Sequence, residues 1–98
     1  MKAELVTREY WDLVDGLTAE IVIWEVPVPL RGSIHRFKYR LALIWADQCV
    51  LRYDNEAGKG DHKHVSGRQV AYEFKSVADL QADFWTDVDE WQKQNLES

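Results

Sequence analysis

The sequence has very little cysteine, with Cys49 as its one example in 98 residues. A lone thiol excludes an intramolecular disulfide and a zinc site built from several cysteines, and it favours a reducing compartment. The longest apolar run, residues 41–46, is far below the roughly 20 residues that a membrane-spanning helix needs. Residues 1–10 contain acidic side chains where a secretory signal peptide requires an apolar stretch. We therefore expect a cytoplasmic protein without membrane contact.

Familiar catalytic signatures are also missing. Lys59 is followed by Gly60 rather than by Ser or Thr, and the glycine spacing of a nucleotide-binding P-loop does not occur. The sequence contains no visible nucleophile elbow or Ser-His-Asp arrangement. It therefore gives no support to P-loop nucleotide hydrolysis or to serine-hydrolase chemistry.

The residues that are present suffice for one hydrophobic core. Hydrophobic residues make up 46% of the chain and aromatic residues 12%, so we expect residues 1–98 to form a single domain. The net charge of −5 is unevenly distributed, because residues 31–68 contain eight Lys and Arg against four Asp and Glu, between acidic flanks. This basic segment could bind a phosphate backbone, although an ordinary solvated sheet explains it equally well.

Hydrophobic periodicity predicts mainly β-strands. The segments with β-favouring or alternating patterns are residues 2–10, 18–26, 35–45, 48–54 and, more briefly, 69–74. In the third segment, apolar side chains alternate with Arg36, Lys38 and Arg40, which is the period of two of a half-buried strand. The basic side chains would form one exposed face that either binds phosphate or is simply solvated.

The hairpin formed by the third and fourth strands has a definite expected register. A three-residue turn over residues 46–48 sets Arg40 opposite Asp54. A two-residue turn would instead place Arg52 against Leu41 in the core, and we reject it because burying an unpaired guanidinium is too costly. Alternation along the fourth strand also predicts that Cys49 is buried and inert.

The C-terminal segment predicts an amphipathic helix. Ser76 is followed three residues later by Asp79, the pattern of a helix N-terminus. Apolar residues then recur at helical spacing at Val77, Leu80, Phe84, Val88 and Trp91. We therefore predict an α+β fold, an antiparallel β-meander of four to five strands covered on one face by a C-terminal α-helix of four or five turns.

Ionisable groups are concentrated after the fourth strand, where we predict a charged loop over residues 55–67. Two histidines, His62 and His64, would project to one side of an extended backbone, with Asp61 and Lys63 on the other. Neutral imidazole accepts a proton and imidazolium donates one near neutral pH. The pair therefore suits RNA cleavage without a metal or cofactor, in which one ring deprotonates the 2′-OH and the other protonates the leaving oxygen.

Cationic side chains beside the histidines complete the candidate site, because they could stabilise an anionic phosphorus. The predicted catalytic residues are His62, His64, Lys59 and Arg52. The predicted binding residues are Arg40, Lys38, Asp54, Glu56, Asp61, Lys63, Gly58 and Gly60. The two glycines would let the backbone approach a ligand closely.

Other interpretations of the same residues stay open. The imidazoles and carboxylates could ligate a divalent metal, but Lys59 and Lys63 would oppose a cation, so we expect no metal. The segment could also belong to a non-catalytic module that binds phosphate, nucleic acid or protein, or it could be only a solvated loop. Aromatic surface could support a homodimer. His35 has no evident partner and is expected only to begin a strand.

Several stretches of the chain carry a resemblance to a known family. They are EIVIWEVP at residues 20–27, GSIHRFKYRLA at 32–42, RYDNEAGKGDHKH at 52–64, YEF at 72–74 and ADFWTDV at 82–88. Over nearly its whole length the chain resembles the TumE-type toxins of type II toxin–antitoxin pairs. The resemblance implies a toxin whose partner is a helix-turn-helix antitoxin protein. It supplies no catalytic roles, so those proposed above come from the residues alone.

Overall fold

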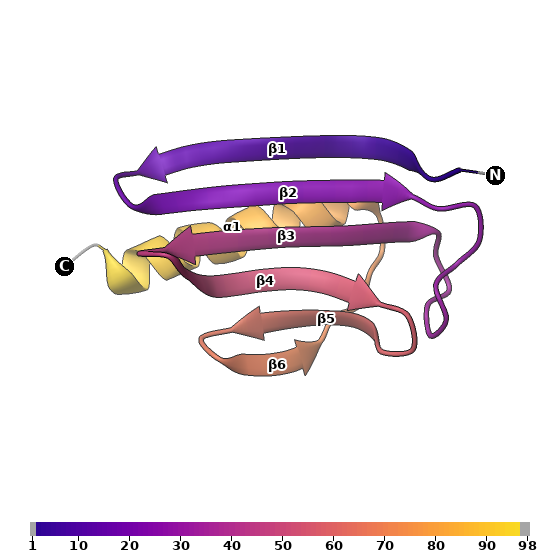
Figure 1. Cartoon of the computed structure of the whole chain (residues 1–98). Coiled ribbons are helices and arrows are strands. Elements are labelled where there is room, and N and C mark those ends of the chain that lie inside the picture. Colours follow the sequence, from indigo (N-terminus) through magenta and orange to yellow (C-terminus); the bar gives the residue numbers. More distant parts are fainter. Residues whose placement is uncertain (1, 97–98) are drawn as a thin grey trace.

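The computed structural model describes residues 2–96 as a six-stranded antiparallel sheet with one helix on one of its faces (Figure 1). Neighbours in the sheet follow the order of the chain, as in a meander. The elements are β1 (Glu4–Val14), β2 (Leu17–Glu25), β3 (Phe37–Trp45), β4 (Gln48–Glu56), β5 (Gly60–Val65), β6 (Arg68–Ala71) and α1 (Val77–Asn95). The α+β class, the meander and the C-terminal helix are confirmed, whereas the predicted number of four to five strands is wrong.

The additional strand lies where we predicted a loop. Most of residues 55–67 belongs to a hairpin in which β5 pairs with β4 on one side and with β6 on the other. All six residues of β5 are half-buried, and charged or polar side chains occur on both of its faces. Because neither face is uniformly apolar, the alternation that identifies a strand from sequence is absent here.

The register of β3 against β4 is the predicted one, but the turn is not. Arg40 lies opposite Asp54, as expected. The turn contains only two residues, Ala46 and Asp47, with φ angles of 50° and 65°. Two consecutive residues in this region are typical of a type I′ hairpin turn.

A β-bulge at Val50 reconciles the short turn with the predicted register. Leu43 pairs with Leu51 while the next residue, Ile44, pairs with Cys49, so Val50 has no partner of its own. The bulge also interrupts the alternation of side chains along β4. Consequently Cys49 is exposed, and the prediction that it is buried was wrong.

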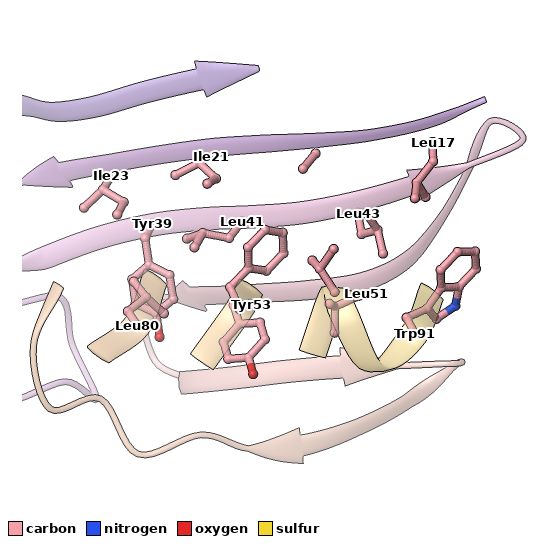
Figure 2. Close-up of a cluster of buried hydrophobic side chains, with 13 residues drawn as sticks. Leu17, Ile21, Ile23, Tyr39, Leu41, Leu43, Leu51, Tyr53, Leu80 and Trp91 are labelled. Carbon is pink, nitrogen blue, oxygen red and sulfur yellow. The ribbon is translucent and has the colours of Figure 1, made fainter. Parts of the chain in front are cut away.

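The core lies between the sheet and α1 (Figure 2). Alternate residues of β2, β3 and β4 point toward the helix, which contributes the apolar stripe predicted from its spacing. The helix begins as expected, because the Ser76 hydroxyl accepts a hydrogen bond of 3.0 Å from the Asp79 amide. The buried residues are Leu17, Ala19, Ile21, Ile23, Tyr39, Leu41, Leu43, Leu51, Tyr53, Leu80, Phe84, Val88 and Trp91.

Three tyrosines at the border of the core each donate a hydrogen bond to a carboxylate. The pairs are Tyr39 with Asp61, Tyr53 with Asp87 and Tyr72 with Asp83. Burial, reinforced by the neighbouring carboxylate, raises the pKa of each of the three hydroxyls above its usual value. The folded state therefore retains these protons at a pH where the unfolded chain releases them.

Stability should accordingly fall at alkaline pH. The raised pKa values contribute stability that is fully present below about pH 10, the usual tyrosine pKa, and is lost as the pH rises beyond it. We expect tyrosinate absorbance to show that these three hydroxyls ionise only as circular dichroism reports unfolding. Ionisation of all three in a chain that is still folded would contradict the hydrogen-bonding scheme.

Candidate functional site

The face of the sheet opposite α1, here called the open face, carries no helix; α1 crosses behind the strands in Figure 1. Tyr53 of β4 points into the core, so its neighbours Arg52 and Asp54 point to the open face. The β4–β5 register sets Arg52 opposite His64 and Asp54 opposite His62. Four ionisable side chains from adjacent strands thus meet on one surface.

These side chains line a hollow of about 190 Å³, which we call the histidine hollow. It contains all four residues predicted to be catalytic and two of those predicted to bind, Asp54 and Glu56. Its lining consists of Arg52, Asp54, Glu56, Lys59, His62, His64 and Gln69. Glu56, Lys59, His62 and His64 were predicted to lie in a loop, whereas Arg52 and Asp54 were predicted on the fourth strand. The pairing of β4 with β5 and the turn between them bring the two sets together.

Arg52 controls the hydrogen bonding of the hollow. Its Nη2 atom lies 3.0 Å from Nε2 of His64. Arginine can only donate, so Nε2 of His64 accepts and the ring proton resides on Nδ1. Nε of Arg52 is 3.0 Å from Oδ2 of Asp54, but its N–H does not align with an acceptor. That contact is therefore an ion pair without a directed hydrogen bond.

His62 and Lys59 are available to a ligand. Within residues 2–96, the His62 ring takes part in no hydrogen bond or ion pair, although it lines the hollow. Nζ of Lys59 lies 3.4 Å from Oε2 of Glu56, and both side chains are more than half exposed. Such a surface pair contributes little to stability, so the ammonium can turn toward an anion at low cost.

Asp61 and Lys63 point to the other side of β5, as the predicted alternation requires. Nζ of Lys63 lies 3.1 Å from Oδ2 of Asp87 on α1 and 5.6 Å from the centre of the Tyr53 ring. These contacts tie β5 to the helix. Neither Asp61 nor Lys63 lines the histidine hollow, although both were predicted to bind.

The glycines of the β4–β5 turn approach another loop of the chain. Gly58 and Gly60 have φ angles of 85° and 75°, which few other residues adopt. A Cβ atom on Gly60 would lie 3.3 Å from the carbonyl oxygen of Gly32, and one on Gly58 would lie 2.9 Å from the Arg31 guanidinium. The structure thus gives these glycines a packing role, and neither of them lines the hollow.

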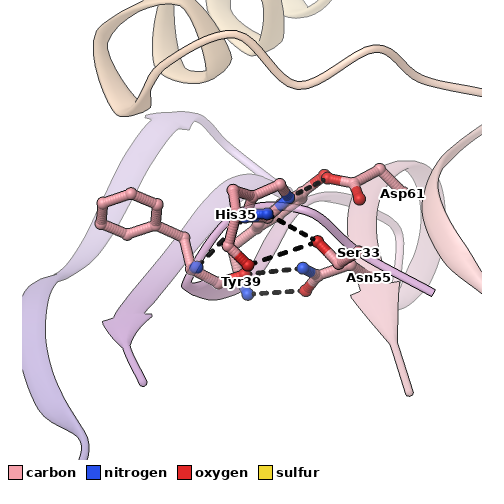
Figure 3. Close-up of polar contacts among 6 residues, drawn as sticks. Ser33, His35, Tyr39, Asn55 and Asp61 are labelled. Atoms are coloured by element: carbon pink, nitrogen blue, oxygen red, sulfur yellow. Dashed lines mark hydrogen bonds and ion pairs between the residues drawn. The ribbon is translucent and has the colours of Figure 1, made fainter. Parts of the chain in front are cut away.

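The expectation that His35 only begins a strand was wrong, because β3 begins at Phe37 and His35 has partners that the sequence did not reveal. Its Nε2 atom lies 2.7 Å from Oδ2 of Asp61, and its Nδ1 accepts a hydrogen bond of 3.1 Å from the Phe37 amide (Figure 3). The ring proton therefore resides on Nε2 and is donated to the carboxylate. Tyr39 donates to the same oxygen at 2.6 Å, and the His35 ring stacks on Phe74 with centroids 3.9 Å apart.

These contacts assign His35 a structural role, since both ring nitrogens are already engaged. The side chains of His35 and Asp61 are only 14% and 9% exposed, which leaves little room for a substrate. The interaction links the segment before β3 to β5, two parts of the chain 26 residues apart. No local periodicity connects residues at that separation.

The Asn55 side chain makes hydrogen bonds to the backbone of β3 in place of the missing backbone bonds between β3 and β4. It is 3% exposed, and it accepts from the Tyr39 amide at 3.0 Å while donating to the Phe37 carbonyl at 2.7 Å (Figure 3). The β3–β4 ladder ends at the pair of Arg40 and Asp54. The Asn55 amide group therefore satisfies strand groups that the ladder leaves unpaired.

Replacing Asn55 with Ala should lower the free energy of unfolding by about 2–4 kcal/mol, because a buried amide and a buried carbonyl would both lose their partners. Denaturant unfolding would measure the change. Asn95→Ala, at an exposed position near the end of α1, is the matched control and should change stability far less. Equal effects of the two substitutions would exclude the proposed role of Asn55.

Comparison with known proteins identifies the family of this chain. The family model described as "Toxin TumE" matches residues 3–92, a range that contains both the histidine hollow and the network around His35. The chain belongs to the TumE toxin family. Membership implies an antitoxin partner for this TumE-family toxin and agrees with the resemblance noted in the sequence. No curated protein and no solved structure matched the chain.

Two further observations concern metal sites and membrane-spanning helices among residues 2–96. Within this range, no group of three or more His, Cys, Asp or Glu side chains is arranged to hold a metal ion. The helix α1 does not combine the length and the apolar character that crossing a bilayer requires.

Proposed function

We propose that this TumE-family toxin is a metal-independent endoribonuclease whose active site is the histidine hollow. The observation that carries the proposal is the meeting of two imidazoles, a guanidinium and an ammonium in one hollow of the open face. Imidazoles can serve as base and acid at neutral pH, and the cations can offset the charge that develops on phosphorus. The proposal places the protein in the cytoplasm, with RNA as its substrate.

His64 is the proposed general base. Its Nε2 lone pair is the acceptor of the Arg52 contact, so the ring is in the form that can receive a proton. A phosphate oxygen is a stronger acceptor than a neutral imidazole, and it would draw the Arg52 guanidinium toward itself. Substrate binding would then expose the His64 lone pair and place the positive charge beside phosphorus in one movement.

The reaction needs no other reactant. His64 removes the proton of a 2′-OH, whose oxygen forms a bond to the adjacent phosphorus. The bond from phosphorus to the 5′ oxygen of the next nucleotide breaks, and His62 as imidazolium donates a proton to that oxygen. The products are a 2′,3′-cyclic phosphate and a 5′-OH. Arg52 and Lys59 stabilise the pentacoordinate phosphorus between these steps.

The same hollow supports a second candidate function. In the structure Arg52 donates a hydrogen bond to Nε2 of His64, and Asp54 lies beside the guanidinium. If this arrangement persists when a phosphate binds, the hollow is a non-catalytic site for phosphate, nucleic acid or protein. We also propose, from the family resemblance, that the antitoxin is a helix-turn-helix protein.

Single substitutions of His62 or His64 by Gln should reduce RNA cleavage by about 10²–10⁴-fold, because each removes a proton-transfer group. The assay is incubation of purified protein with total RNA, with and without EDTA, and cleavage should be equal in the two conditions. Lys75→Gln, at an exposed position outside the hollow and just before α1, is the control and should retain cleavage.

Intact RNA after incubation with the unsubstituted protein would reject the nuclease, and growth arrest that still depends on His62 would then indicate another activity. The binding alternative predicts that the double His→Gln variant continues to bind RNA in a salt-dependent manner while the unsubstituted protein leaves it uncleaved.

The position of cleavage should depend on one hydroxyl group. An oligoribonucleotide with a single 2′-deoxy nucleotide on the 5′ side of the cleaved bond should resist cleavage there, because the nucleophile has been removed. Mass spectrometry of the unmodified substrate should find 2′,3′-cyclic phosphate ends. Cleavage of the deoxy substrate at the same bond would show that water, and not the 2′-OH, attacks phosphorus.

A further inference from the structure

The open face extends well beyond the histidine hollow. Residues directly opposite each other in an antiparallel sheet project to the same side, so the register defines rows of side chains that cross the strands. One row consists of Arg8, Val22, Arg40, Asp54 and His62. The adjacent row consists of Tyr10, Glu20, Ala42, Arg52, His64 and Gln69. Each row joins β1 to the hollow.

Two more hollows lie along these rows. One of about 250 Å³ is bordered by Trp24, Lys38 and Arg40. Another of about 410 Å³ is bordered by Arg8 and Tyr10 and also by Glu9 and Glu20. They share Val22 in their linings, so they are adjacent. We call the hollow bordered by Trp24, Lys38 and Arg40 the middle hollow. Because Arg40 lies opposite Asp54, the middle hollow lies beside the histidine hollow. The three hollows thus follow one another across the sheet.

Unpaired positive charge accompanies this path. Lys38 and Arg40 are exposed, and neither lies within ion-pair distance of a carboxylate among residues 2–96. The Arg8 guanidinium lies 5.9 Å from the centre of the Trp24 ring. On the other side of the molecule, α1 is strongly acidic, with Asp79, Asp83, Asp87, Asp89 and Glu90. A polyanion would therefore be attracted to the part of the open face around Lys38 and Arg40. It would be repelled from the helix and from the carboxylates of Glu9 and Glu20 beside Tyr10.

Aromatic rings on the same surface can hold bases. Tyr10 is 64% exposed, and Trp24 is half-buried at the border of the middle hollow. Bases stack on aromatic side chains without regard to sequence, provided that they are not already paired in a duplex. Basic groups interleaved with aromatic rings along a shallow path are the features of a surface that binds single strands.

We infer that the open face binds single-stranded RNA along a path from Tyr10 and Trp24, past Lys38 and Arg40, into the histidine hollow. From β1 to β5 the path crosses five strands about 4.8 Å apart, a length of about 19 Å, which is enough for several nucleotides. The inference rests on the proposed function and specifies its substrate. The phosphates contact Lys38 and Arg40, the bases stack on the rings, and the chain delivers one 2′-OH to His64.

The test measures binding separately from cleavage. In the double variant His62→Gln/His64→Gln, fluorescence anisotropy would follow binding of labelled oligoribonucleotides of increasing length. Adding Lys38→Gln and Arg40→Gln should weaken binding of a long single strand about tenfold and reduce the slope of log affinity against log salt by about 1.4. Trp24→Ala and Tyr10→Ala should also weaken binding, with less effect on the salt slope.

The matched control removes the same charge elsewhere. Lys75→Gln with Lys93→Gln changes the net charge equally, but Lys93 lies on α1 and Lys75 just before it. Equal losses in the two double variants would overturn the path, as would equal affinity for a duplex of the same sequence. If the unsubstituted protein cleaves RNA while the Lys38 and Arg40 variants bind normally, the path is wrong and the nuclease stands. If binding follows the path but no cleavage occurs, the nuclease is wrong and the path stands.

Discussion

The pairing of β3 with β4 determines both the core and the candidate site. The bulge at Val50 allows a two-residue turn to coexist with a register that sets Arg40 opposite Asp54. A slip of one residue would turn Tyr53 out of the core and Arg52 into it, which would bury a guanidinium among apolar side chains. Hydrophobic burial beneath the sheet therefore selects the register that assembles polar groups on its open face.

The strand that carries the two histidines is anchored from the opposite side. Along β5, Asp61 is held by His35 and Tyr39, while Lys63 is paired with Asp87 of the helix. His62 and His64 point to the open face, where the His62 ring is available to a ligand and the His64 ring accepts a hydrogen bond from Arg52. Because a catalytic group must be held in place to act efficiently, the fixed underside gives the histidine hollow a rigid base.

The distribution of charge matters more to function than its sum. The chain has a net charge of −5, which by itself argues against a nucleic-acid partner. However, the acidic side chains of α1 lie on the far side of the sheet from Lys38 and Arg40. A small acidic protein can thus present a local cationic patch at Lys38 and Arg40, on a face that also carries Glu20, Asp54 and Glu56.

Local patterns in the sequence determined the α+β class, the first four strands and the cap at Ser76, because periodicity and capping depend on residues close in the chain. They also marked Arg52, Lys59, His62 and His64, which the structure gathers in one hollow. The tertiary structure alone decided that residues 60–65 form a strand, that Cys49 is exposed and that His35 binds Asp61. A strand with polar side chains on both faces has no apolar alternation. A bulge changes the phase of the alternation that follows it. A contact between residues 26 apart exists only after the intervening chain has folded.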